Sequence, residues 1–197
     1  MDQVFEQQLQ KLEANRLASF TYGLAQIEAN LTADQFSFSQ DGSGSSSKQG
    51  NFPSLAEIET RIADALRKAT CLRRLWLAVP SENSALQDCV QFLTTSSALR
   101  DVTLICFNKE NADKCTRAVQ HSSVIRRFEL HCSEFPVEAI CDLISSNRSI
   151  EDLDLKGSET SDLPHIFNLN SPAIMRLAFA LSSNNTLKKV HFERFLF

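Results

Sequence analysis

Five short segments of the chain share one pattern, in which the first, fourth and sixth positions are apolar. They begin at Leu72, Leu99, Ile125, Ile150 and Leu187, so that successive starts lie 27, 26, 25 and 37 residues apart. A helical pattern precedes each segment, and its last apolar residue falls six or seven positions upstream, at Leu66, Leu93, Val119, Leu143 and Leu181. A short polar stretch separates the two. This regular repetition of helix and strand predicts stacked repeats, in which each unit buries its apolar residues against its neighbours.

The sequence also predicts where the first helix of this series begins. Ser54 and Glu57 have the spacing of a capping box, and Leu55, Ile58, Ile62 and Leu66 follow on one helical face. The repeats are therefore expected to occupy residues 54–197, as about five units.

The residues before the repeats divide into two parts. Residues 1–34 carry apolar residues at helical spacing and predict an amphipathic helical arm, as one long helix or two short ones: Phe5, Leu9, Leu12, Phe20, Leu24, Ile27 and Leu31. This arm either packs on the body of the protein or serves as a docking or oligomerisation helix. Residues 35–53 hold three of the five glycines and a cluster of serines, which is typical of a flexible linker.

The repeated segments, such as Leu72-Arg-Arg-Leu75-Trp-Leu77, resemble leucine-rich repeats, and their period resembles the ribonuclease-inhibitor-like class found also in NLR-type proteins. The resemblance covers residues 54–197. It implies an α/β solenoid with a curved parallel sheet and outer helices. The family commonly places Asn or Cys three residues after the last repeat leucine, whereas this chain has Pro80, Phe107, Ser133, Ser158 and Phe195 there. The last unit also has an insertion, at 158–171.

Side chains at the third and fifth positions of each repeat, and at the position after it, should share the sheet face away from the helices, because successive residues of a strand alternate sides. This face mixes charges of both signs, which favours a protein partner over a polyanion. The predicted partner-binding residues are Arg74, Trp76, Asp101, Thr103, Arg127, Glu129, His131, Asp152, Asp154, Lys189 and His191. Ala78, Ile105, Lys156 and Glu193 are expected on the same face.

Trp76 is the only tryptophan and stands beside Arg74, and both residue types are frequent in interaction hot spots. The alternative is that the N-terminal segment covers Trp76. Asp152 and Asp154 could do acid–base work or hold a cation, or could form a solvated acidic patch facing Arg127. The second interpretation is favoured, and the histidines have no metal-ligand spacing.

Composition narrows the function further. The formal net charge of −4 gives no basic excess for binding nucleic acid, and no apolar run reaches the length of a membrane span. The acidic N-terminus differs from a secretion signal. Six cysteines without CxxC spacing predict free, mostly buried thiols in a cytosolic or nuclear setting, and we expect an intracellular, cytoplasmic protein. Cys106 and Cys132 should lie in adjacent turns, and Cys141 should lie in the core.

No nucleophile, phosphate-binding or dinucleotide motif is present in the sequence, so an enzyme is not expected and neither is a cofactor. We expect a non-enzymatic module that binds a partner protein on its concave sheet. The alternative is a structural subunit of a larger complex, docked through the N-terminal helix and the Phe-rich C-terminus. Phe195, Leu196 and Phe197 would then contact another subunit, or else fold back as a cap.

Overall fold

The computed structural model describes residues 3–14, 17–22, 54–80, 83–157 and 172–193 of the 197-residue chain. Helices and strands alternate along it. The helices are α1 (Gln3–Glu13), α3 (Leu55–Lys68), α4 (Asn83–Thr95), α5 (Lys109–Gln120), α6 (Val137–Ser146) and α7 (Pro172–Ser183). The strands are β1 (Ser19–Tyr22), β2 (Arg74–Ala78), β3 (Asp101–Cys106), β4 (Arg127–Cys132), β5 (Asp152–Gly157) and β6 (Lys189–Glu193).

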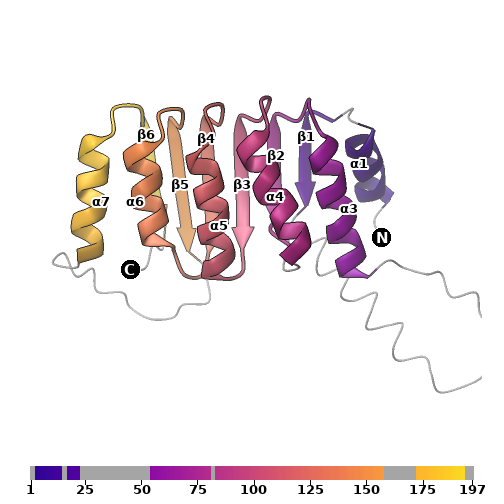
Figure 1. Ribbon diagram of the computed structural model, residues 1–197, viewed down its shortest axis with the longest axis horizontal. Coiled ribbons are helices and arrows are strands. Elements are labelled where there is room, and N and C mark those ends of the chain that lie inside the picture. The colour runs from indigo at the N-terminus through magenta and orange to yellow at the C-terminus, as the bar shows by residue number, and fades with distance from the viewer. Residues whose placement is uncertain (1–2, 15–16, 23–53, 81–82, 158–171, 194–197) are drawn as a thin grey trace, which may run out of the picture.

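The six strands form one parallel sheet in sequential order, from β1 to β6, and the helices form a layer over one of its faces (Figure 1). The fourth repeat positions lie side by side across the sheet. They pair in the order Leu75, Val102, Phe128, Leu153 and Val190. The predicted α/β solenoid of stacked strand–helix units is confirmed.

The core lies between the sheet and the helix layer. The first, fourth and sixth repeat positions are fully buried in the four repeats that begin at Leu72, Leu99, Ile125 and Ile150. In the last repeat Leu187 and Val190 are only partly buried, and Phe192 is 36% exposed. Among the described residues, the last unit therefore covers its neighbour and has no further unit stacked on it.

The helix over 55–68 also begins as predicted. The Ser54 hydroxyl accepts a hydrogen bond from the Glu57 N–H, and the Glu57 carboxylate accepts one from the Ser54 N–H at 2.7 Å. This capping box satisfies backbone donors that the first helical turn leaves without partners.

The prediction of a helical arm is wrong for residues 19–22. They form β1, which pairs in parallel with β2, so that Phe20 lies beside Leu75. Phe20 and Tyr22 are buried and alternate with exposed neighbours, as in a half-buried strand. Leu17, Phe20 and Tyr22 have the same first, fourth and sixth spacing as the five repeats. The N-terminal segment is a sixth unit of the solenoid, with α1 as its helix.

The N-terminal arm was expected either to pack on the body of the protein or to dock elsewhere. Its described part packs on the body. Phe5, Leu9 and Leu12 of α1 are buried in the common core. Arg61 of α3 pairs with Glu6 at 3.0 Å and with Glu13 at 3.2 Å, which fixes α1 against α3. The expected linker at 35–53 and the insertion at 158–171 lie outside the described residues.

Asparagine ladders connect adjacent units at the turn from helix to strand. The Asn147 side-chain nitrogen donates to the carbonyls of Val119, Gln120 and Ser122 in the preceding turn. Its oxygen accepts from the backbone N–H groups of Ser149 and Ile150. One buried amide thus satisfies backbone groups of two units.

The same position is repeated in the neighbouring turns. Asn184 donates to the Ile144 carbonyl at 2.6 Å and accepts from the Leu187 N–H at 2.8 Å. In the turn before Asn147, the Ser122 hydroxyl accepts from the Ile125 N–H at 3.3 Å. This ladder stands three residues before the repeats that begin at Ile125, Ile150 and Leu187, not three residues after the last repeat leucine, where Phe107 is 53% exposed.

Candidate functional site: the strand face

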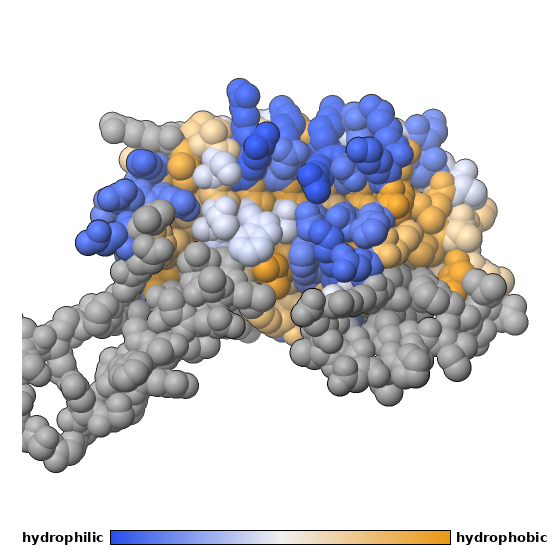
Figure 2. Space-filling model, turned by 180° about the vertical axis from the view of Figure 1, so that it is seen from behind, coloured by the Kyte–Doolittle hydropathy of each residue, from blue (hydrophilic) through white to orange (hydrophobic). Residues whose placement is uncertain are grey.

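The strand face is the set of side chains on β2–β6 that point away from the helices. Figure 2 views the molecule from this side, and hydrophilic residues form a band along it. Alternation of charge across adjacent strands organises the band. The third repeat positions pair in the order Arg74, Asp101, Arg127, Asp152 and Lys189, so that positive and negative groups alternate.

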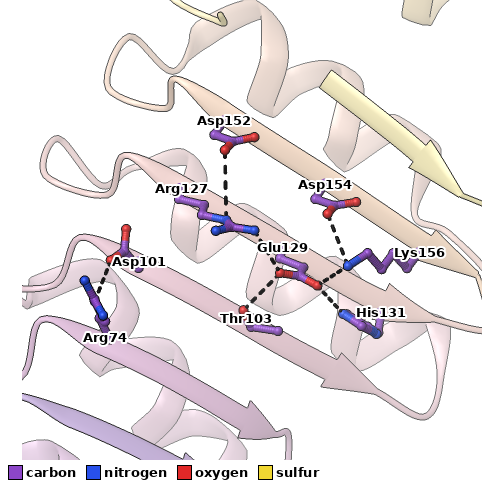
Figure 3. Close-up of polar contacts among 9 residues, drawn as sticks. All are labelled: Arg74, Asp101, Thr103, Arg127, Glu129, His131, Asp152, Asp154 and Lys156. Carbon is purple, nitrogen blue, oxygen red and sulfur yellow. Dashed lines mark hydrogen bonds and ion pairs between the residues drawn. The ribbon is translucent and has the colours of Figure 1, made fainter. Parts of the chain in front are cut away.

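Two ion pairs form along this row. Arg74 Nε lies 3.1 Å from an Asp101 carboxylate oxygen, and Arg127 Nε lies 4.0 Å from one of Asp152 (Figure 3). The Arg74 side chain is 73% exposed, so water screens its pair strongly. Asp152 faces Arg127 as expected, but the Asp154 side chain is only 13% exposed, so the two carboxylates do not form the solvated acidic patch that the favoured interpretation described.

A tighter network surrounds Glu129 in the middle of the sheet. One carboxylate oxygen contacts Lys156 Nζ at 2.5 Å and His131 Nε2 at 2.7 Å (Figure 3). The other oxygen accepts from the Thr103 hydroxyl at 3.4 Å and lies 3.6 Å from an Arg127 nitrogen. These four contacts come from three adjacent strands, and the Glu129 side chain is only 13% exposed.

The network controls the charge of its members. Burial alone would raise the pKa of Glu129, but hydrogen bonds from Lys156 and His131 outweigh it and hold that pKa below its ordinary value. The hydrogen bond to Glu129 in turn raises the pKa of Lys156. Both groups are therefore charged near neutral pH, and each fixes the other's position.

The two carboxylate oxygens of Asp154 differ in their contacts. One of its carboxylate oxygens lies 3.2 Å from Lys156 Nζ, while the other, Oδ1, is buried and accepts no hydrogen bond. A buried carboxylate oxygen without a donor is unfavourable, and the ion pair of the other oxygen with Lys156 offsets part of that cost.

Below the Arg74–Asp101 pair, the strand face on β2 and β3 is less polar. Ala78 and Ile105 are buried, and Trp76 is half-buried against the same hydrophobic cluster. Trp76 lies between Thr21 and Thr103 in the sheet. The alternative, in which the N-terminal segment covers Trp76, concerns residues that are partly outside the described ranges, but β1 does occupy the neighbouring sheet position.

The structure brings six of the predicted residues into one network: Thr103, Arg127, Glu129, His131, Asp152 and Asp154. Arg74 and Asp101 form a separate pair, and Trp76 lies in the less polar part with Ala78 and Ile105. Lys189 and His191 are exposed on β6, where His191 Nε2 lies 4.0 Å from Glu193. Lys156 was not among the predicted binding residues, although its position directly after a repeat places it on this face.

Within the described ranges, no group of three or more His, Cys, Asp or Glu side chains is arranged to hold a metal ion. No described helix is long and apolar enough to cross a membrane. All six cysteines are free, and all but Cys71 are buried. Cys106 and Cys132 are direct partners in adjacent strands, and Cys141 lies in the core, as predicted.

Comparison with known proteins gives structural neighbours only. A structure described as the actin-binding site 2 of leiomodin-1 matches with a TM-score of 0.52 and 13% identity, over 93% of this chain and 91% of that one. The tropomodulin C-terminal domain of Caenorhabditis elegans matches with a TM-score of 0.53 and 15% identity, over 91% of this chain and 92% of that one. No family model matches the chain, and neither does any curated protein.

The fold is of the leucine-rich-repeat type. At this level of identity the neighbours support the architecture that the repeat pattern predicted, with its parallel sheet and helical layer. The narrower assignment to the ribonuclease-inhibitor-like or NLR-type class stays a prediction.

Proposed function

We propose that this chain is a non-enzymatic protein-interaction module that binds its partner on the strand face. The observation that carries the proposal is the preformed network at Glu129, which holds charged groups in fixed positions beside the half-buried Trp76. Side chains that are ordered before binding lose less entropy on association. Such a surface is suited to recognition because the position of each charge is already set.

The chemistry of the face defines what a partner should offer. Trp76 would contact an apolar or aromatic side chain, since large aromatic groups anchor many interfaces. A carboxylate of the partner would pair with Arg127, whose side chain is 51% exposed. The mixed charges around both residues would select orientation.

The structural neighbours suggest a first partner to test. The leiomodin-1 structure is described as an actin-binding site, and this chain has the same fold. Actin is therefore the first protein for a binding assay. An intracellular location is in keeping with an actin partner and with six free thiols.

The test is a capture experiment with the full chain as bait. Trp76→Ala and Arg127→Glu, alone and together, should reduce capture of the partner at least tenfold. Arg148→Glu makes the same change of charge in an exposed turn away from the proposed site and should bind like the unchanged chain. Full capture by the folded double variant would refute the assignment of the strand face.

The alternative of a subunit docked through its N-terminal helix loses one of its supports. Phe5, Leu9 and Leu12 of α1 are buried inside this chain, so these three are not available to another protein, whereas Leu24, Ile27 and Leu31 lie outside the described residues. The Phe-rich C-terminus, Phe195, Leu196 and Phe197, lies outside the described residues. The neighbouring helix α7 nevertheless exposes apolar side chains, which suggests a surface separate from the strand face.

A further inference from the structure

Helix α7 differs from the other repeat helices on its outer surface. Met175 and Phe179 stand twelve and eight residues before the first position of their repeat and are 59% and 74% exposed. In the four preceding repeat helices these two positions hold polar or charged residues: Thr60 and Asp64, Gln87 and Gln91, Asp113 and Arg117, and Glu138 and Asp142. Packing within the solenoid therefore does not explain the apolar pair.

The side of α7 that faces away from α6 is apolar as well. Ala178 is exposed, whereas the equivalent positions of α3, α5 and α6, which are Ala63, Thr116 and Cys141, are buried. Ile174 and Leu181 are only half-buried. A helix that is apolar around most of its circumference is normally covered on more than one side.

Strand β6 lies at the same end and pairs on one side only among the described strands. The Lys189 N–H donates to the Glu151 carbonyl, toward β5. Because successive backbone groups of a strand alternate sides, those of Val190 and Phe192 point toward the open edge. Figure 2 shows the corresponding end of the molecule, at the right of that view, as a hydrophobic area.

The sequence of β6 is complementary to itself when reversed. Its side chains on the strand face are Lys189, His191 and Glu193, with opposite charges at the two ends. If a second copy pairs antiparallel with His191 opposite His191, each Lys189 stands opposite a Glu193. Val190 then stands opposite Phe192, and these are the residues whose backbone groups point outward. One register thus satisfies charge, apolar contact and backbone hydrogen bonding together.

We propose that the C-terminal end of the solenoid is a self-association surface, on which a second copy docks by antiparallel pairing of β6. The two sheets continue into one another across a two-fold axis, and the two α7 helices lie side by side. Ala178 permits close approach of these helices, Ile174 and Leu181 fill the contact, and the exposed ring of Phe179 covers its outer side. Such an interface is isologous, so it closes after two copies. It is independent of the partner proposed for the strand face.

The test measures the mass of the full chain by sedimentation velocity and light scattering, over a concentration series up to about 100 μM. The unchanged chain should be a dimer. Lys189→Glu and Glu193→Lys each place like charges opposite one another twice and should each give monomers. An equimolar mixture of these two variants should form dimers again, because every facing pair is then of opposite charge.

Two further variants separate the interface from folding defects. Phe179→Asp introduces the residue that α3 carries at this position, and it should weaken the dimer at least tenfold while the circular dichroism spectrum stays unchanged. Gln91→Asp is the matched change on α4 and should leave the dimer intact.

Several results would overturn the proposal. A monomeric unchanged chain would show that α7 is covered by another part of the chain or by a different protein. A dimer that tolerates both charge reversals, or variants that do not recover on mixing, would exclude the proposed pairing of β6.

Discussion

The two ends of the solenoid differ in how well their terminal units cover the hydrophobic core. At the N-terminal end α1 and β1 complete the core, and Phe5, Leu9 and Leu12 are all buried while the outward positions of α1 carry Gln and Lys. At the C-terminal end α7 and β6 leave Phe179 and Phe192 exposed. A repeat protein needs polar outer faces on its terminal units to stay apart from other molecules. Only the first end meets that requirement among the described residues.

The largest expected effect contrasts the two terminal strands. Phe20→Ala should lower the free energy of unfolding by about 3–5 kcal/mol, because a fully buried ring is lost from the core. Phe192→Ala should cost less than about 1 kcal/mol, since that ring is already partly in water. Urea unfolding followed by circular dichroism measures both, under conditions where the chain is monomeric. Equal losses would mean that the ends are equally well covered.

A second contrast uses the asparagine ladder. Asn147→Ala should lower stability by about 3 kcal/mol, because several buried backbone groups lose their partner. Asn184→Ala, at the half-buried last turn, should cost about 1 kcal/mol. Asn147→Ser is the conservative control, since Ser122 already accepts a backbone hydrogen bond at the equivalent place. A loss at Asn184 as large as at Asn147 would contradict the contrast between interior and end.

A variant in the middle of the sheet gives a stability change with which the changes at both ends can be compared. Glu129→Gln should cost about 1–3 kcal/mol at pH 7, because charged hydrogen bonds to Lys156 and His131 are weakened. The pKa of Glu129 is lowered in the folded chain, so its contribution is complete above the ordinary glutamate pKa of about 4.3 and is lost as the pH falls through the folded value. The stability difference between variant and unchanged chain should therefore shrink in acid. A difference that is constant from pH 7 to pH 3 would argue against this role.

The smallest effect is a difference in labelling rates of thiols. Cys141, beneath α7, and Cys115, in the interior, are both buried, and burial raises the pKa of Cys141. Local opening should be easier at the less covered end, so Cys141 should react with a thiol reagent before Cys115 but after the half-buried Cys71. Mass spectrometry of labelled peptides gives the order. Faster labelling of Cys115 than of Cys141 would show that the C-terminal end does not open more easily than the interior.

Much of this architecture could be predicted from the sequence because the repeated apolar positions are a local signal. Leu75, Val102, Phe128, Leu153 and Val190 were expected side by side and lie so. The first unit is not recognisable from the sequence because Phe20 also fits the helical spacing of Phe5 and Leu9. The alternation of buried and exposed residues in β1 covers only four residues, which is too short to outweigh that helical pattern.

For the candidate site, the sequence could predict only which side chains share one face of the sheet. Strand alternation placed Glu129, His131 and Asp154 on one side of the sheet, and the structure agrees. Which of these charges meet depends on side-chain reach across three strands, and no spacing in the sequence encodes it. Lys156 shows this, because the side chain that joins Glu129 to Asp154 belongs to the position with the least distinctive pattern.

The pairing of β1 with β2 has a consequence for how the chain can vary. These neighbours in the sheet are separated by α3 and by residues 23–53, so a long stretch of polypeptide begins and ends at adjoining places in the fold. The entropy of closing such a connection grows only logarithmically, by about 0.6 kcal/mol for each doubling of its length. Lengthening this connection ahead of α3 should accordingly cost little free energy, so a reporter domain inserted there should leave the pairing of β1 with β2 intact.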